Sequence, residues 1–212
     1  MGIRHTSFKH GWFYHYRVHE PKVEMLCEDE FCRLKGFMEK MHEACPDHYF
    51  TTGPRSSALK FDVDVKPMEV EGHEVCKLAE IGVSCGRYKT AHSNVEVYML
   101  ENDSATIGVE VPIWIMPYEL DGFRAMFESE EPLTGHIDIL RVEDGKIWIW
   151  DYKPNAHREK FAHCQTLFYA LMLSRRTGIS LDNFRCGYFD EKLAFVFKPE
   201  IEQAVLMQEI IT

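Results

Sequence analysis

The sequence predicts an α/β (α+β) fold, because segments with the two-residue period of β-strands and segments with the helical period follow one another along the chain. The strongest strand signal is a hairpin over residues 133–153, whose arms meet at Asp144-Gly145, a dipeptide that tolerates the positive φ angles of a two-residue turn. The strongest helix signal is an apolar stripe over residues 157–176, which Gly178 ends.

Weaker patterns predict the other elements. In chain order they are a strand or loop over residues 1–20, a helix over 21–45, a loop over 51–57, a short helix over 68–79, a helix over 87–101, a strand over 106–116, a second hairpin over 184–197 and a closing helix over 200–211. We expect residues 61–212 to form the core, and residues 1–60 to form a helical and aromatic N-terminal extension packed on it.

The first 20 residues are rich in aromatic side chains and histidines, and Lys9 and Arg17 lie among them. Packing of these rings on the core is the more common arrangement. The alternative is a platform on which unpaired bases stack.

Composition and charge limit the class of protein. The 212 residues are 45% hydrophobic and 27% charged, with a formal net charge of −10. This charge argues against a general polyanion binder, so a nucleic-acid partner would need a local basic groove. No apolar run is long enough to span a bilayer and the N-terminus lacks an apolar signal core, so we expect a cytoplasmic protein without membrane contact.

The seven cysteines form no Cys-x-x-Cys pair. Cys27 and Cys32, with Cys45 further on, match a metal-binding spacing loosely, and buried or free thiols are the favoured interpretation. We therefore expect no iron–sulfur cluster.

The first hairpin predicts a cluster of charged side chains. If Asp144 and Gly145 are the central turn residues, paired positions sum to 289, and Asp138 lies opposite Asp151. Lys153, two residues beyond, points to the same face. Two facing carboxylates destabilise a sheet unless they are neutralised, and they suit a hard divalent cation. The alternative is a solvated strand face.

Two upstream segments carry further candidate ligands. His92 shares an apolar stripe of the helix over 87–101, where a hydrogen-bonded core histidine is the usual case, and Glu96 lies on the same side. Glu110 stands between valines inside the strand over 106–116, where a buried acid needs a partner.

The helix over 157–176 offers polar and basic groups. Gln165 and Tyr169 are four residues apart and therefore neighbours on its surface. Basic residues outnumber acidic ones there, and an arginine in the loop over 51–57 could reach a phosphate. The candidate DNA-binding residues are Arg158, Lys160, Arg175, Arg176 and Arg55.

The order of these motifs resembles the PD-(D/E)XK nuclease superfamily, and within it the RecB-like exonuclease branch, which includes CRISPR-associated adaptation nucleases. The residues that carry the resemblance are Gly135 and Asp138, Asp151 and Lys153, and Gln165 and Tyr169. The resemblance implies a restriction-endonuclease-like core, in which helices flank a central mixed β-sheet.

The resemblance also implies residue roles. Asp138, Asp151 and the Tyr152 carbonyl would bind Mg²⁺ or Mn²⁺, and Lys153 would activate water and steady charge on the phosphate. Gln165 and Tyr169 would position the metal site and the DNA backbone. A histidine from an upstream helix and a glutamate from an upstream strand are frequent additions in this branch. His92 and Glu110 occupy such places, and Glu96 and Glu80 compete with His92 for the helical position.

The function that the resemblance implies is metal-dependent hydrolysis of DNA, with an exonuclease on DNA ends in repair or recombination as the leading hypothesis. Single-stranded ends are weakly favoured, and a homo-oligomer is compatible with the sequence. One alternative is an inactive nucleic-acid-binding or assembly module that keeps the fold. Another is a hydrolase of small phosphoesters, which the basic helix disfavours.

Overall fold

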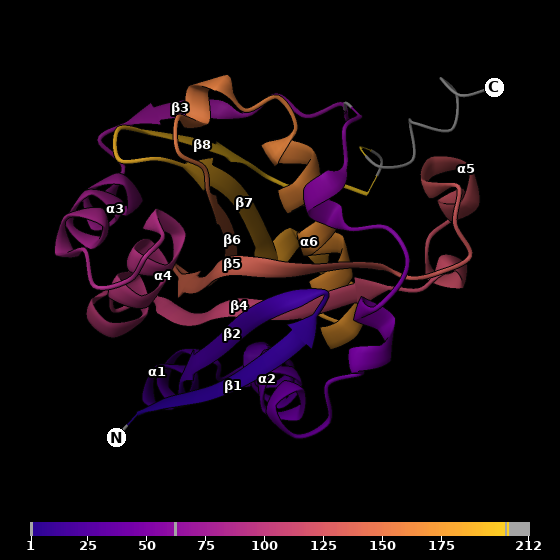
Figure 1. Cartoon of the computed structure of the whole chain (residues 1–212), viewed down its shortest axis with the longest axis horizontal. Helices are drawn as coiled ribbons and strands as arrows, with labels where there is room; N and C mark the ends of the chain where they lie inside the picture. Colours follow the sequence, from indigo (N-terminus) through magenta and orange to yellow (C-terminus); the bar gives the residue numbers. More distant parts are fainter. Residues whose placement is uncertain (1, 62, 202, 204–212) are drawn as a thin grey trace.

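An eight-stranded mixed sheet forms the centre of the molecule (Figure 1). The structure, a computed structural model, describes residues 2–61, 63–201 and 203. The strand order is β1-β2-β4-β5-β6-β7-β8-β3. All neighbours among the described strands are antiparallel except β6 and β7, which are parallel. The strands are β1 (Ile3–His10), β2 (Trp12–His19), β3 (Met68–Glu71), β4 (Thr106–Ile115), β5 (Leu133–Glu143), β6 (Lys146–Tyr152), β7 (Phe184–Phe189) and β8 (Leu193–Phe197).

Helices pack on both faces of this sheet. The main ones are α1 (Glu20–Leu26), α2 (Cys32–Ala44), α3 (Glu74–Cys85), α4 (Ala91–Asn102), α5 (Phe123–Phe127) and α6 (Ala162–Thr177). The larger apolar cluster joins α1, α2 and α6 to strands β4 to β7. A second cluster joins α3 and α4 to the opposite face through Val109, Ile139 and Trp150. Helices on both faces of a mixed sheet confirm the predicted fold class.

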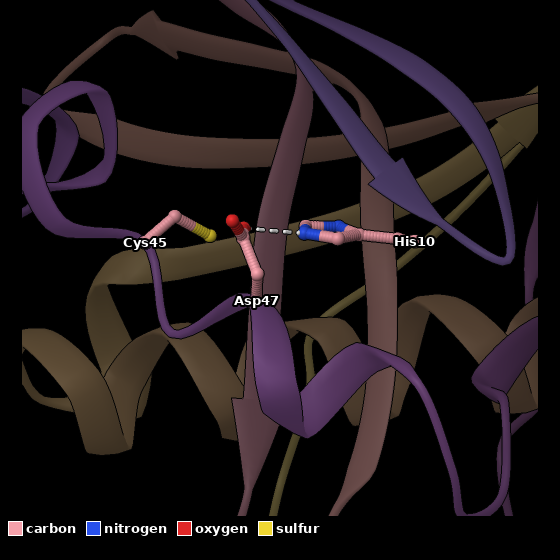
Figure 2. Close-up of side chains that lie close together, drawn as sticks. All are labelled: His10, Cys45 and Asp47. Atoms are coloured by element: carbon pink, nitrogen blue, oxygen red, sulfur yellow. Dashed lines mark hydrogen bonds and ion pairs between the residues drawn. The ribbon is translucent and has the colours of Figure 1, made fainter.

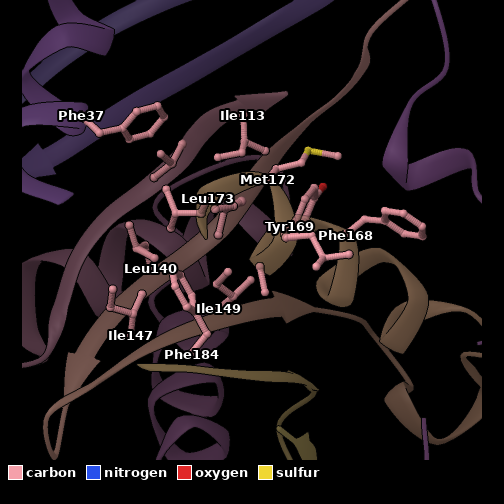
Figure 3. Close-up of a cluster of buried hydrophobic side chains, with 14 of the residues drawn as sticks. Phe37, Ile113, Leu140, Ile147, Ile149, Phe168, Tyr169, Met172, Leu173 and Phe184 are labelled. Atoms are coloured by element: carbon pink, nitrogen blue, oxygen red, sulfur yellow. The ribbon is translucent and has the colours of Figure 1, made fainter. Parts of the chain in front are cut away.

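The larger cluster holds α6 in place. Leu167, Phe168 and Leu173 of α6 are fully buried, and Ile149 and Phe184 lie against the helix from β6 and β7 (Figure 3). Burial of large apolar side chains stabilises the fold by about 1.5–3 kcal/mol for each. The apolar residues of α6 therefore fix the helix against the sheet, and its polar residues are fixed with them.

The predicted register of the central hairpin is confirmed. Ile139 pairs with Trp150 and Glu143 with Lys146, so paired positions sum to 289. Asp144 and Gly145 have φ angles of 50° and 65°, as a tight turn between antiparallel strands requires. The strands predicted at 106–116 and 184–197 are also present.

Several predicted helices have different bounds. Residues 68–71 pair with β8 as a strand, because Met68-Glu-Val-Glu alternates and Gly72, with a φ angle of 68°, separates it from α3. The long C-terminal helix begins at Ala162, not at residue 157, because Asn155 adopts a φ angle of 65° and a 3-10 turn follows. The helix predicted over 21–45 is divided into α1, a short 3-10 turn and α2.

The N-terminal residues form a β-hairpin that continues the central sheet, since β2 pairs with β4. The division of the chain at residue 60 stays a prediction. Most of the helix predicted over 200–211 lies outside the described residues. Within the described part of the chain, none of the helices combines the length and the apolar character needed to cross a bilayer.

Candidate active site

Asp138 and Asp151 face each other across β5 and β6. Asp151 is fully buried, whereas Asp138 keeps part of its surface in solvent. The two carboxyl groups hydrogen-bond to one another, which requires a proton on one of them. The Tyr152 N–H also donates to Asp138 Oδ2 at 3.2 Å. The predicted facing pair is therefore formed.

The protonation of this pair follows from its surroundings. Burial, together with the charge of Asp138, raises the pKa of Asp151 to about 8. Burial also raises the pKa of Asp138 to about 6, although the Lys153 ammonium opposes the increase. At neutral pH the pair thus holds a proton that a bound cation would displace.

Lys153 is the nearest positive charge. Its Nζ lies 2.7 Å from Asp151 Oδ2. Its backbone N–H donates to the Phe189 carbonyl in β7 at 2.9 Å. Burial alone would lower the pKa of Lys153, but the Asp151 and Asp138 carboxyl groups raise it above its ordinary value. Lys153 is therefore an ammonium at neutral pH.

Helix α6 supports the carboxylates from one side. Gln165 Nε2 donates to Asp151 Oδ1 at 3.2 Å and to the Tyr169 hydroxyl at 2.9 Å. Tyr169 also hydrogen-bonds to Ser56. A Cβ atom at position 135 would overlap both Ser56 Oγ and the Tyr169 ring, so only glycine allows α6 this close to β5. The Gly135 of the motif is thus required for packing.

Glu110 approaches from β4. The pairs Val109–Ile139 and Val111–Ile137 bracket it, so Glu110 lies opposite Asp138. Its φ angle is 53°, a left-handed conformation that is unusual for a non-glycine residue inside a strand. Burial raises its pKa to about 7, and the charge of Asp151 contributes in the same direction. A strained acid beside two others is typical of a functional site.

Helix α4 adds two groups from the opposite face of the sheet. Glu96 is buried, and burial together with Glu110 and Asp138 raises its pKa well above the ordinary value. The His92 ring stands edge-on to Tyr152 at 5.0 Å and hydrogen-bonds to the Tyr152 backbone. Burial lowers the pKa of His92, so the ring is neutral and able to act as a ligand.

Three residues on upstream helices were predicted as possible ligands, and they differ in their position relative to the carboxylate pair. His92 and Glu96 both lie beside the carboxylate pair, and electrostatic interactions connect them with it. Glu80 lies exposed on α3 and is not among the groups that shift the pKa values of these carboxyl groups.

The predicted DNA-binding residues fall into three places. Arg158 and Lys160 are exposed in the turn between β6 and α6, a few residues after Lys153. Arg175 and Arg176 lie about 15 Å from Gln165, at the far end of α6. There Arg175 donates to the Glu119 carbonyl, and Arg176 pairs with the Glu119 carboxylate and lies over the Trp114 ring. Arg55 donates to the carbonyls of His10 and Phe50.

Two residues near the site were not predicted from local motifs. The Arg17 guanidinium, in β2, lowers the pKa values of Glu110 and Glu96. Tyr14, in the same strand, stacks on His136 with 3.6 Å between ring centroids and interacts electrostatically with Glu110. The one sequence signal was the basic and aromatic character of the first 20 residues, but nothing local assigned it to this site.

A second group of possible metal ligands lies where the N-terminal hairpin meets the segment after α2 (Figure 2). Ligand atoms of His10, Cys45 and Asp47 lie within 4.8 Å of one another. Hydrogen bonds already connect them. His10 Nε2 is 2.9 Å from Asp47 Oδ1, and the Cys45 thiol forms a hydrogen bond with the Asp47 side chain. His10 Nδ1 is also 2.8 Å from His136 Nε2. These hydrogen bonds are sufficient to explain why the polar side chains lie close together. Cys27 and Cys32, which the sequence associated loosely with Cys45, are free thiols and are absent from the group.

The side chains around the Asp138–Asp151 pair have the chemistry of a site for a hard divalent cation, although among the described residues only His10, Cys45 and Asp47 bring three ligand atoms within 4.8 Å of one another. The oxygens around the pair come from Asp138, Asp151 and Glu110, with Glu96 and the neutral His92 ring beside them. Carboxylate oxygens are the ligands that Mg²⁺ and Mn²⁺ prefer. The elevated carboxyl pKa values indicate a site whose negative charge a cation would stabilise.

A family comparison covers this region. The model of the PD-(D/E)XK nuclease superfamily matches residues 83–209, which include the carboxylate pair, Lys153 and α6. Residues 1–82, with the N-terminal hairpin and α2, lie outside the match. No curated protein and no solved structure matches the chain.

Proposed function

Because the chain belongs to the PD-(D/E)XK nuclease superfamily, whose members use divalent metal ions on nucleic acid, we propose that it is a metal-dependent deoxyribonuclease. The observation that carries the proposal is the facing pair of Asp138 and the buried Asp151, with the Lys153 ammonium 2.7 Å from Asp151. An inactive module of the same fold would have no need to keep two repelling acids and a lysine together.

In this proposal Asp138, Asp151 and the Tyr152 carbonyl hold Mg²⁺ or Mn²⁺, and Glu110 and His92 complete the site. Bound there, the cation supplies a water of lowered pKa and neutralises charge on the phosphate. Glu96 is the competing ligand. It competes with His92 for the ligand position on α4, but its full burial makes it costly to ionise, whereas the His92 ring binds a cation in its neutral form.

The surrounding residues have separate roles. The Lys153 ammonium orients the attacking water and stabilises negative charge as it develops on the phosphate oxygens. Gln165 positions the Asp151 carboxylate through the 3.2 Å hydrogen bond, and Tyr169 holds Gln165 in turn. These contacts support a site whose geometry is set before substrate binds.

We also propose that the substrate is DNA with a free end, preferably single-stranded, and that cleavage is exonucleolytic. A chain with a net charge of −10 is suited to a substrate that it contacts at only a few phosphates. The exposed side chains of Arg158 and Lys160, a few residues after Lys153, are suited to make some of these contacts. A RecB-like relationship, a role in repair or recombination, a cytoplasmic location and a homo-oligomer stay predictions.

The experiment compares wild type with Asp151→Ala on end-labelled single- and double-stranded DNA, in Mg²⁺, Mn²⁺ or EDTA. Asp182→Ala is the matched control, because Asp182 is an exposed acid paired with Lys198. We expect wild type and the control to cut with either metal, and Asp151→Ala to be at least about 100-fold slower, because even residues that only support a metal ligand change activity by 10–100-fold.

The products decide the mode of cleavage. A ladder that shortens from an end indicates an exonuclease, and discrete internal fragments indicate an endonuclease. Equal persistence of the DNA with wild type and Asp151→Ala under every condition would contradict the proposal and favour the binding module.

A further inference from the structure

The N-terminal hairpin differs in charge from the rest of the chain. Residues 3–19 contain Arg4, Lys9, Arg17 and four histidines, but no aspartate or glutamate, in a chain with 34 acidic residues and a net charge of −10. The hairpin is therefore a local basic surface on an acidic protein, as a contact with a polyanion requires.

The two faces of the hairpin have different compositions because side chains alternate along a strand. Phe8, Tyr16 and Val18 are buried in the larger apolar cluster. The opposite face pairs Lys9 with Phe13, Ser7 with His15 and His5 with Arg17. We call these six residues the hairpin face. Ser7, His5 and His15 hydrogen-bond to one another, which orders its centre.

Large aromatic rings are exposed at the tip of this hairpin. Phe13 is 60% exposed and Trp12 is 77% exposed, and Gly11, with a φ angle of 79°, forms the turn before them. By strand alternation Trp12 belongs to the opposite face, so Phe13 is the exposed ring of the hairpin face. An exposed ring beside cations is a combination with which proteins bind single strands, since bases stack on the ring and phosphates contact the cations.

The other end of the hairpin face adjoins the candidate active site. Arg17 pairs with Val109, the residue before Glu110, and its charge lowers the pKa values of Glu110 and Glu96. Phe13 precedes Arg17 by four residues of one strand, a distance of about 13 Å. The face therefore leads from an exposed ring to the edge of the acidic cluster.

We propose that the hairpin face binds single-stranded nucleic acid and directs it to the candidate active site, with a base stacked on Phe13 and phosphates beside Lys9 and Arg17. This inference rests on the proposed nuclease function and names its substrate-binding surface. A single strand fits better than a duplex because stacking on Phe13 needs an unpaired base and few cations are available. The hairpin lies outside the region that the family model matches.

The experiment uses the full chain with Asp151→Asn, which prevents cleavage, and labelled oligo(dT) of about 20 nucleotides, a length that exceeds typical single-strand sites. Fluorescence anisotropy gives the affinity. We expect Phe13→Ala to weaken oligo(dT) binding by about tenfold, at the low end of the range for base stacking, and to leave the affinity for a duplex of equal length unchanged. Tyr118→Ala, at another exposed aromatic, should bind as the parent does.

A second variant tests the charge. We expect Lys9→Ala to reduce the slope of log affinity against log salt concentration by about 0.7, the value for one phosphate contact on a single strand. Lys77→Ala, at an exposed lysine of α3, is the matched control and should leave the slope unchanged. Melting temperatures of all variants show whether each is folded.

Three results would overturn the inference. They are absence of oligo(dT) binding by the parent, unchanged binding by Phe13→Ala, and equal weakening of single-strand and duplex binding. If Phe13→Ala turns a dimer into a monomer without changing DNA affinity, the face is an interface between copies, and the inference fails as well. DNA cleavage by wild type with unchanged binding by Phe13→Ala removes this inference alone. If Phe13→Ala loses oligo(dT) binding but wild type cleaves no DNA, the nuclease proposal fails and this inference stands.

Discussion

Asp151 illustrates at the scale of a residue how this site combines charge with burial. It is fully buried, faces another acid and has a pKa raised to about 8, with Glu110 at about 7 and Asp138 at about 6. Such groups are unfavourable for stability and are retained at sites where charge is needed. Lys153 and Gln165 offset part of this cost by contacting Asp151 directly.

These pKa values predict that cation binding depends on pH. Binding needs ionised carboxylates, and all three acids lose their protons only as the pH rises through about 6 to 8. We expect Mg²⁺ affinity to increase over this interval and binding to release protons. Calorimetry in buffers of different ionisation enthalpy at several pH values measures both, and affinity independent of pH would contradict the prediction.

Asp151 also predicts a change in stability. A carboxyl group whose pKa is higher in the folded state than in the unfolded state loses stabilising effect as the pH rises from about 4 through its folded value, here about 8. Asp151→Asn removes this loss. The metal-free variant should therefore melt at a higher temperature than wild type at pH 8, by about 2–4 °C for each kcal/mol recovered.

Thermal melting in EDTA and in Mg²⁺ measures this effect. Wild type should gain stability from Mg²⁺, and Asp151→Asn should gain little, because the variant lacks a carboxylate that we propose as a ligand. Asp182→Asn, at an exposed acid whose pKa Lys198 lowers, should not melt at a higher temperature than wild type. A lower melting temperature for metal-free Asp151→Asn at pH 8 would contradict this account.

At the scale of elements, the site depends on the close contact between β5 and α6. The contact is possible because Gly135 has no Cβ, and it lets Tyr169 and Gln165 reach Asp151. Apolar residues of α6 hold the helix against the sheet in the larger cluster, to which Tyr169 also belongs (Figure 3). A displacement of α6 would therefore alter the site without changing any of its carboxylates.

Gly135→Ala tests this contact. The added methyl group overlaps Ser56 and Tyr169, so we expect a loss of about 1–3 kcal/mol in the free energy of unfolding and at least a tenfold loss of nuclease activity. Gly36→Ala is the control, because a Cβ there meets nothing and alanine favours the α2 helix by about 0.5–1 kcal/mol. Chemical denaturation and initial cleavage rates measure both, and a Gly135→Ala variant as active as wild type would contradict the role given to Gly135.

At the scale of the whole molecule, a chain with a net charge of −10 carries an N-terminal hairpin without acidic residues. This hairpin lies along the edge of the central sheet (Figure 1). Strand β2 joins this hairpin to the central sheet through β4, so residues far apart in the sequence meet at one place. The arrangement limits the number of phosphate contacts to the few cations near the site. Binding should therefore be local and of moderate strength.

This charge distribution predicts a shallow dependence of DNA binding on salt. With three to five phosphate contacts, the slope of log affinity against log salt concentration should be about −2 to −3.5 for a single strand. Anisotropy titrations of the Asp151→Asn chain at several NaCl concentrations measure it. A slope steeper than about −5 would show that many more cations bind DNA than the hairpin and the turn after β6 provide.

Much of the central architecture was predictable because its signals are local. The Asp144-Gly145 turn sets the register of β5 and β6, and Gly178 ends α6 where expected. Residues 68–71 were predicted incorrectly as helix, because pairing with β8 outweighs a weak helical pattern. The start of α6 was missed because Asn155 and the 3-10 turn after it are not apparent in the apolar periodicity.

The hairpin register, the facing of Asp138 and Asp151, and the motif order that leads to the family all follow from the sequence without a structure. These depend on neighbours in the chain, whose geometry follows from strand alternation and turn chemistry. The folded chain was needed to show that Glu96 and Glu110 lie beside this pair with Arg17 near both glutamates, and that Arg175 and Arg176 contact Glu119 about 15 Å from Gln165. Those contacts arise from the packing of α4, β2 and α6 on the sheet, which no local pattern specifies.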